Sequence, residues 1–258
     1  MSRRTTDSPE AWDYYLRGME ALIRFTKEAN LKAQQMFEKA IELDSGFAGA
    51  YSGLGWTYYM EWSRRWNQNL HALERAFALA QKATALNDSL PGAHLLLGWI
   101  HIGRKQHEHA IAEAERVVTL DPNSADGYAM FGQFLSFAGR PEEAIGLIQK
   151  AMRLNPRYPV LYEFYLGYAY WLTRQHEEAI KAHKRALVRN PDYQPSQVNL
   201  AVLYSELGRE TEAQVTVTSL IEKDPNFSLD VVRQTWSYNR DPAVLERILA
   251  ALRKAGLK

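Results

Sequence analysis

Small and apolar positions recur about every 34 residues along the chain, in six consecutive repeats. We count positions from the first residue of each repeat and omit the extra residues of the two longer ones. Position 8 holds Gly18, Gly55, Gly98, Gly132, Gly167 and Ala201, and position 20 holds Ala33, Ala76, Ala110, Ala144, Ala179 and Ala213. Because small residues let two helix backbones approach closely, this pattern predicts an antiparallel helix pair in each repeat.

Most repeats end at an acidic or amide residue followed by proline. Asp121-Pro122 and Asn155-Pro156 are two examples, and proline cannot continue a helix. The predicted repeats span 11–47, 48–90, 91–124, 125–158, 160–193 and 194–227. The first two are longer, and their extra residues fall between positions 8 and 20. We expect a polar N-terminal tail over 1–10 and a C-terminal cap over 228–258.

The pattern resembles the tetratricopeptide repeat, a helix–turn–helix unit of 34 residues. The resemblance covers residues 11–227. It implies an all-α, right-handed superhelical solenoid of about six such units plus a C-terminal capping helix. In arrays of this kind each repeat contacts mainly its neighbours, so the core is continuous along the stack. The resemblance implies protein binding without naming the partner, because the fold serves many functions.

Three segments carry a narrower resemblance. They are the opening AWDYYLRG, the stretched second repeat, and the closing PNFSLDVVRQTWSYNRDPAVLERILAALRKAGL. Together they resemble the tetratricopeptide arrays found C-terminal to class III adenylate/guanylate cyclase domains. These residues contain no cyclase catalytic domain, so the resemblance implies a regulatory or protein-binding segment, or a stand-alone relative, rather than cyclase activity.

The segment 228–258 contains one amphipathic helix. Asp241 suits an N-cap, Pro242 suits the first helical position, and Gly256 suits the C-terminal stop. An apolar stripe at helical spacing lies between them. We interpret this helix as a solenoid cap with cations near its C-terminus, and a membrane-surface or partner helix is the alternative.

The extension of the second repeat contains Trp62, Arg64, Arg65 and Trp66. Two indoles and two guanidinium groups could hold a ligand by stacking and bidentate hydrogen bonds. The alternative is a longer helix end on which tryptophan packs as a lid.

Composition narrows the class of protein further. The 258 residues carry a formal net charge of +1, and a balanced charge argues against a nucleic-acid binder. The absence of cysteine removes disulfides and thiolate metal sites. No apolar run reaches about 18 residues, and the N-terminus has no signal-peptide pattern. We therefore predict a cytoplasmic protein that binds neither nucleic acid nor membrane.

Candidate chemistry is sparse. The sequence His-Glu-His at 107–109 looks like a metal cluster, but residues two apart on a helix point to different faces. His183 occupies a core position that holds Phe37 and Ile148 in other repeats. The sequence has no phosphate-binding glycine loop, nucleophile elbow or HExxH motif. We predict that the protein is not an enzyme and uses no cofactor or metal.

The resemblance to the tetratricopeptide family places positions 5, 9, 12 and 13 of each first helix on the concave surface. Here these positions are mostly aromatic or apolar, which disfavours a Lys, Asn and Arg clamp for a terminal carboxylate. The predicted groove residues are Trp56, Tyr59, Trp99, Gln133, Phe137, Phe164, Tyr168 and Trp171. We hypothesise that a peptide or partner segment binds there, because Tyr and Trp bury large areas at low entropy cost. The alternative is that these rings only pack between neighbouring helices.

Two other functions stay open. The chain could be a regulatory or sensory segment of a larger signalling protein such as a class III nucleotide cyclase. It could also form a homo-oligomer, in which exposed apolar surface pairs two copies.

Overall fold

The computed structural model describes residues 6–66 and 71–258, and within these ranges every regular element is a helix. The prediction of an all-α fold is confirmed. The predicted tail over 1–10 lies partly outside the described residues, and the first helix already begins at Pro9, with the side chain of Ser8 as its N-cap.

The first twelve helices form six consecutive pairs. The pairs are α1 (Pro9–Leu22) with α2 (Lys27–Leu43), α3 (Ala48–Ser63) with α4 (Ala72–Leu86), α5 (Pro91–Gly103) with α6 (His107–Leu120), α7 (Ala125–Phe137) with α8 (Pro141–Leu154), α9 (Val160–Leu172) with α10 (His176–Arg189), and α11 (Gln194–Glu206) with α12 (Glu210–Lys223). Two further helices follow, α13 (Leu229–Thr235) and α14 (Pro242–Lys254). Each pair falls within one predicted repeat, apart from the early start of α1.

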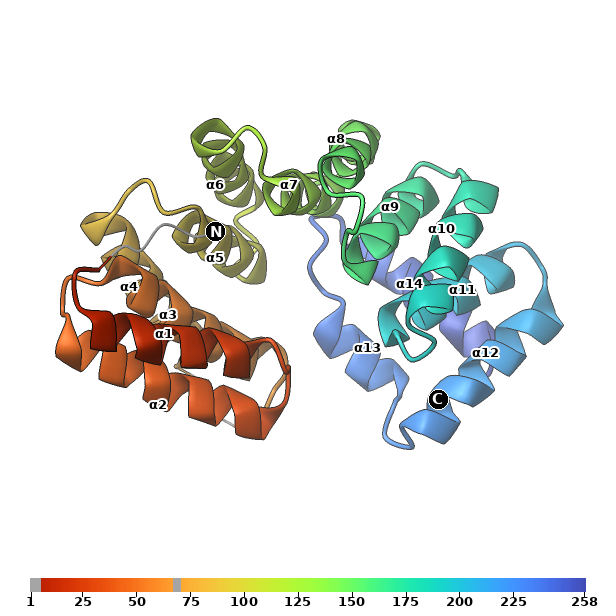
Figure 1. Cartoon of the computed structure of the whole chain (residues 1–258). Coiled ribbons are helices and arrows are strands. Elements are labelled where there is room, and N and C mark those ends of the chain that lie inside the picture. Colours follow the sequence, from red (N-terminus) through yellow and green to blue (C-terminus); the bar gives the residue numbers. More distant parts are fainter. Residues whose placement is uncertain (1–5, 67–70) are drawn as a thin grey trace. The chain divides into compact units, whose positions relative to one another are not determined.

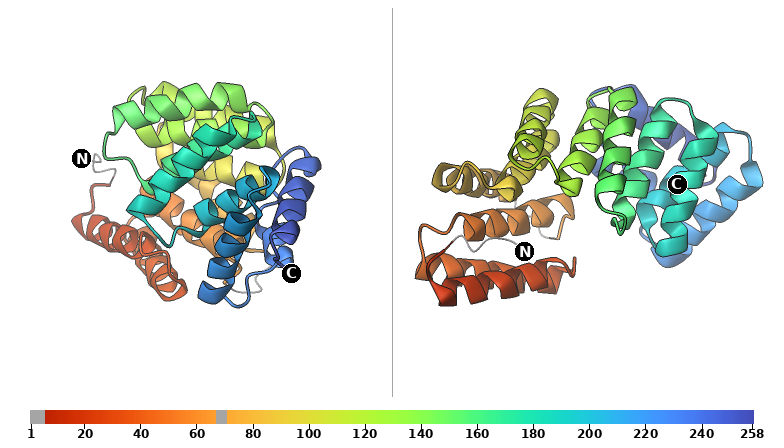
Figure 2. Two further views of the ribbon diagram at one scale, coloured as in Figure 1. Left: turned by 90° about the vertical axis from the view of Figure 1, so that its right-hand side faces the viewer. Right: turned by 45° about the horizontal axis from the view of Figure 1, so that its top comes forward.

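The chain divides into two compact units. The first comprises residues up to Arg104 together with Ala112–Pro122, and the second comprises Lys105–Ile111 together with Asn123–Lys258. In the first unit α1 packs on α2, α2 on α3, and α4 on α5. The second unit continues the same alternation from α7 to α12 (Figure 1, Figure 2).

Glycines at position 8 lie at close contacts between paired helices, as the sequence predicted. A Cβ atom at Gly132 would lie 2.6 Å from Cγ1 of Ile148 and 3.0 Å from the carbonyl oxygen of Ala144. At Gly167 it would lie 2.7 Å from the imidazole ring of His183. A side chain at Gly132 or Gly167 would require the facing side chain or the paired helix to shift, so close packing offsets the low helix propensity of glycine.

The C-terminal helices do not extend the stack of pairs. Helix α14 packs against α11 and against α13, and its buried side chains include Ile248, Leu249 and Leu252. Asp241 is the N-cap of this helix, because its carboxylate accepts a hydrogen bond from the backbone N–H of Ala243, as its sequence position predicted. The segment predicted as a cap therefore lies on a first helix of the second unit.

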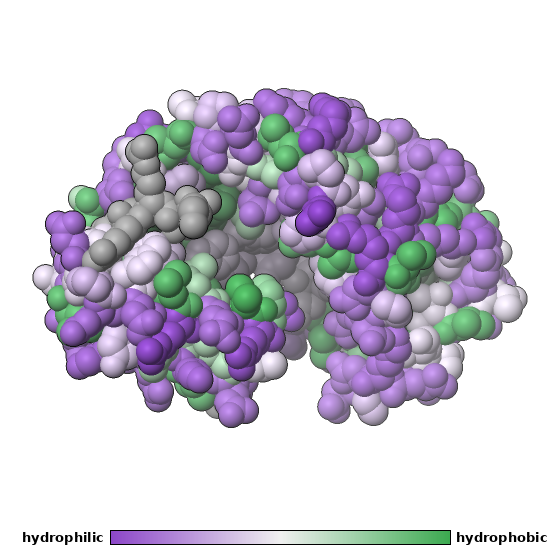
Figure 3. Space-filling model, in the orientation of Figure 1, coloured by the Kyte–Doolittle hydropathy of each residue, from purple (hydrophilic) through white to green (hydrophobic). Residues whose placement is uncertain are grey.

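The surface of both units is mostly hydrophilic on the face that Figure 3 shows, with apolar residues in separate patches. Among the helices of the described residues, none combines the length and the apolar character needed to cross a bilayer. The same residues contain no cluster of three or more His, Asp or Glu side chains placed to hold a metal ion.

Candidate functional site

The predicted groove residues all lie on first helices of their repeats, but they divide between the two compact units. We call the surface formed by positions 5, 9, 12 and 13 of the first helices the inner face. In the first unit α3 carries Trp56 and Tyr59, and α5 carries Trp99. In the second unit the predicted residues are Gln133, Phe137, Phe164, Tyr168 and Trp171, on α7 and α9.

An aromatic cluster occupies the inner face of the first unit. The ring of Tyr59 lies 5.7 Å from Trp56, 5.8 Å from Trp62 and 6.3 Å from Trp99, measured between centroids. Tyr59 itself is only 7% exposed, whereas the three tryptophans are partly buried at its edge. The indole N–H of Trp56 donates to the carbonyl oxygen of Gly92 at 3.3 Å, which fixes the orientation of the indole.

The extension of the second repeat contributes to this cluster. Helix α3 runs to Ser63, and Trp62 in its last turn packs so closely that a Cβ atom at Gly103 would lie 2.7 Å from its indole. This contact favours a longer helix end with a packed tryptophan. Ligand binding by Arg64 and Arg65 stays a prediction.

The first repeat adds apolar residues that the sequence analysis did not include in the groove. Tyr15, Met19 and Leu22 stand at positions 5, 9 and 12 of α1, and all three are partly buried. The same positional pattern could have found them, because positions 5, 9 and 12 apply to the first repeat as they do to the later ones.

In the second unit most of the predicted groove residues are buried. Gln133 and Trp171 are 0% exposed and Tyr168 is 1% exposed. Phe137 is also buried, and Phe164 is partly buried. Tyr59 of the first unit is buried as well, so five of the eight predicted groove residues are inaccessible to a partner in this conformation. Their role in binding stays a prediction.

Trp171 is buried by a charged group from the C-terminal helix. Its indole N–H donates to Oε2 of Glu206 at 2.9 Å, and Nη2 of Arg247 donates to the same oxygen at 2.8 Å. The guanidinium of Arg247 also lies 4.3 Å from the centre of the indole. Burial alone would raise the pKa of Glu206, but hydrogen bonds from Arg247 and Trp171 outweigh it and lower that pKa. The arrangement holds α14 against α9 and α11.

The loop between α13 and α14 covers other inner-face residues of the second unit. We call its residues 236–241 the strap. The ring of Trp236 lies 6.1 Å from Phe164, nearly perpendicular to it, and the ring of Tyr238 lies 5.5 Å from Phe137. In the sequence these two aromatic residues stand two apart in a stretch without a helix pattern, and we predicted them only as part of the cap over 228–258.

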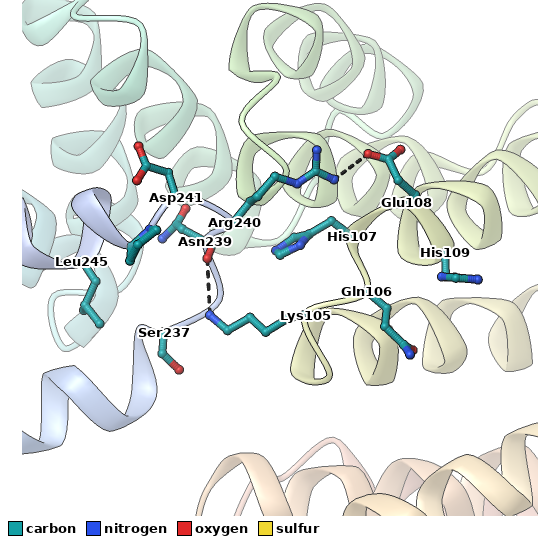
Figure 4. Close-up of a pocket in the computed structure, with 11 residues that line it drawn as sticks. Lys105, Gln106, His107, Glu108, His109, Ser237, Asn239, Arg240, Asp241 and Leu245 are labelled. Carbon is teal, nitrogen blue, oxygen red and sulfur yellow. Dashed lines mark hydrogen bonds and ion pairs between the residues drawn. The ribbon is translucent and has the colours of Figure 1, made fainter.

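The start of α6 faces the strap. His107 Nε2 donates to the carbonyl oxygen of Tyr238 at 2.8 Å. Glu108 pairs with Arg240 at 2.5 Å (Figure 4). Lys105 Nζ donates to the carbonyl oxygen of Asn239 at 3.3 Å, and burial lowers the pKa of this lysine. Beside these contacts lies a pocket of about 680 Å³. Within the His-Glu-His sequence, His107 and Glu108 therefore hold the strap.

Models of the tetratricopeptide repeat match residues 91–124, 130–195 and 170–230. The chain belongs to the tetratricopeptide repeat family. Members of this family are generally scaffolds rather than enzymes, and the fold makes this chain a protein–protein interaction module.

Comparison with individual proteins agrees with this class. A Rhizobium meliloti relative whose name assigns it to the adenylate cyclases is 32% identical over 97 residues, which are 36% of this chain and only 16% of that protein. The structure of PilW, a type IV pilus biogenesis factor, superposes with a TM-score of 0.62 at 20% identity, over 81% of this chain and 90% of PilW. The structure of the APC/C complex Cut9-Hcn1 superposes with a TM-score of 0.68 at 16% identity, over 96% of this chain and 46% of the matched chain. At these identities the two structures share the fold.

Proposed function

We propose that this protein binds a segment of a partner protein on the inner face of its first compact unit. The observation that carries the proposal is the ring cluster around Tyr59, whose flanking Trp56 and Trp99 stay partly accessible. Positions 5, 9 and 12 of the first three repeats hold no charged residue. The surface therefore suits a segment with apolar anchors better than one recognised by its terminal carboxylate.

The expected ligand is an extended or helical segment with at least two apolar side chains. Tryptophan and tyrosine are enriched among the residues that dominate binding energy at protein interfaces. Burying one large apolar side chain contributes about 1.5–3 kcal/mol, so two anchors account for a large part of a micromolar affinity. The balanced charge and the lack of cysteine support a cytoplasmic module that needs no nucleic acid, membrane or cofactor.

The test is affinity capture from native host lysate with the Trp56→Ala/Trp99→Ala variant beside the unsubstituted chain. We expect the variant to retain at least tenfold less of the partner, because both indole rings that would contact the bound segment are removed. Its circular dichroism should show unchanged helicity. Trp171 is unsuitable for this test, since its complete burial would confound binding with folding.

The matched control replaces two exposed apolar side chains outside the cluster, Leu16→Ala/Val188→Ala, which are 49% and 84% exposed. This control is expected to capture the partner as well as the original chain does. A folded Trp56→Ala/Trp99→Ala variant that captures the partner normally would remove the inner face of the first unit as the binding site.

A second candidate function rests on the adenylate cyclase relative. In this reading the chain is a regulatory segment of a larger signalling protein. An antibody raised against this chain distinguishes the two: a host polypeptide much larger than 29.6 kDa would support the regulatory segment, and a band near that mass would contradict it.

A further inference from the structure

The strap is held through its main chain. Three consecutive residues take part: the carbonyl oxygens of Tyr238 and Asn239 accept hydrogen bonds from His107 and Lys105, and the N–H of Arg240 donates to the carbonyl oxygen of Phe137 at 2.8 Å. Main-chain hydrogen bonds of this kind supply affinity in peptide recognition and are independent of the bound sequence.

Its side chains are held by the predicted groove residues. Trp236 contacts Phe164 at position 5 of α9, and the amide oxygen of Asn239 accepts a hydrogen bond of 2.8 Å from the hydroxyl of Tyr168 at position 9. Asn239 is only 6% exposed, so its amide is enclosed by this contact. Pockets for particular side chains supply specificity in peptide recognition.

The strap does not serve to cover the end of the repeat stack. The last second helix, α12, carries Gln214 and Thr216 at positions 21 and 23, where α10 carries the buried Ile180 and Ala182. Polar residues at these two positions already suit the terminal face to solvent. The strap instead lies over inner-face positions 5, 9 and 13 of the second unit.

We propose that the inner face of the second unit is a peptide-binding site that the chain's own strap occupies, and that a partner segment with aromatic–x–aromatic–amide chemistry displaces it. This inference extends the proposed function to a second site and names the chemistry that the site accepts. This pattern is taken from Trp236, Tyr238 and Asn239 of the strap. An arginine after the amide would add the ion pair that Arg240 makes with Glu108.

The strap competes with a partner from within the molecule. Helix α14 keeps its own anchor, since Arg247 pairs with Glu206 independently of the strap, so a released strap stays tethered beside its site. A short tether gives an effective concentration in the millimolar range. If the free segment bound with a dissociation constant of about 0.1 mM, the tethered strap would weaken a competing segment roughly tenfold.

The experiment measures binding of a fluorescein-labelled synthetic peptide of residues 234–242 to the full chain by fluorescence anisotropy. The released variant is Trp236→Ala/Tyr238→Ala, and the matched control is Ser237→Ala, a partly exposed residue of the same strap. We expect the released variant to bind the peptide at least tenfold more tightly than the unsubstituted chain, and the control to match the unsubstituted chain. A peptide with alanine at both aromatic positions is expected not to bind.

Equal affinity of the released variant and the unsubstituted chain for the peptide, including no binding by either, would overturn the proposal. If the released variant loses helicity, Asn239→Ala keeps both ring contacts and replaces it in the same assay, with at least threefold tighter peptide binding expected. Introducing Trp56→Ala/Trp99→Ala is expected to leave the anisotropy result unchanged. Failure of this assay therefore leaves the first-unit site standing, and failure of the capture experiment leaves the strap site standing.

Discussion

At the residue scale, His183 shows how a titratable side chain can serve as a core residue. It is 0% exposed, its ring packs on Phe164 at 6.1 Å, and it fills the space left by Gly167. Burial lowers the pKa of His183 to about 3. The imidazole is therefore neutral in the folded protein at any moderate pH, in keeping with a position that other repeats fill with apolar side chains.

This burial predicts a pH-dependent stability that His183→Leu should remove. The unfolded chain binds a proton at this histidine below about pH 6.5, and the folded chain does not until about pH 3, so acid favours unfolding. The stability of the unsubstituted chain is thus fully present above pH 6.5 and falls by about 1.4 kcal/mol per unit below it. Urea unfolding at pH 7.5 and pH 5 is expected to show the variant gaining about 2 kcal/mol relative to the unsubstituted chain.

Comparing the two chains cancels the titration of all the groups that they share. His183→Gln is the control for volume, since it cannot titrate and should follow the leucine variant. If the free energy of unfolding changed with pH in the same way for the unsubstituted chain and both variants, the prediction would be wrong, and His183 would be accessible to protons in the folded chain.

At the element scale, the sequence predicts the helix pairs well because each boundary has a local cause. Position 8 and position 20 define the contact between paired helices, and Asp-Pro or Asn-Pro defines where a pair ends. The N-cap at Asp241 is equally local. The surface that a segment covers is not local, and the burial of Trp171 by Arg247 joins residues 76 positions apart along the chain.

The strap explains why the candidate site was predicted only in part. The positional pattern predicted Tyr168 and Phe137 as groove residues, and in the structure both contact the strap. Nothing in a repeat pattern says that a later, non-repeating loop returns to that face. The amphipathic stripe of α14 indicated a packed helix, but an apolar stripe carries no information on which helix it packs against.

The first helix carries a charged residue at a position that is apolar in the other five repeats. Position 7 is Leu54 or another apolar residue in the five later repeats, but in α1 it is Arg17, paired with Asp13 at 2.8 Å; these side chains are 61% and 55% exposed. Since exposed ion pairs contribute little to stability, this pair is better explained by keeping the face solvated.

We therefore expect Asp13→Ala/Arg17→Leu to promote self-association while leaving the helix content unchanged. The substitution adds apolar surface beside Leu16, which is already 49% exposed. Light scattering across a concentration series should give a larger weight-average mass for the variant than for the unsubstituted chain. Asp13→Ala/Arg17→Gln, which removes the same ion pair without adding apolar surface, is the control and should not associate. Identical masses for all three chains would show that the ion pair is not needed to prevent self-association through this face.

At the scale of the whole molecule, the stability of a repeat array is close to a sum of terms for each repeat and for each interface between neighbours. A core substitution should then loosen its own repeat and the adjacent ones before it affects distant repeats. Trp171 is a suitable probe, because it is completely buried and holds both Glu206 and Arg247.

Trp171→Ala is expected to cost about 3–5 kcal/mol, the usual range for deleting a buried aromatic side chain. Hydrogen exchange should show the protection of α9, α11 and α14 falling together, because the indole, the carboxylate and the guanidinium form one contact set. Protection of α1 and α2 should change far less, since they belong to the other compact unit. Trp171→Phe retains a ring under Arg247 but loses the indole N–H, so its loss should be smaller and confined to the same helices. A uniform fall in protection from α1 to α14 would instead show that the chain unfolds as one cooperative body, and the two inner faces could then be coupled through stability alone.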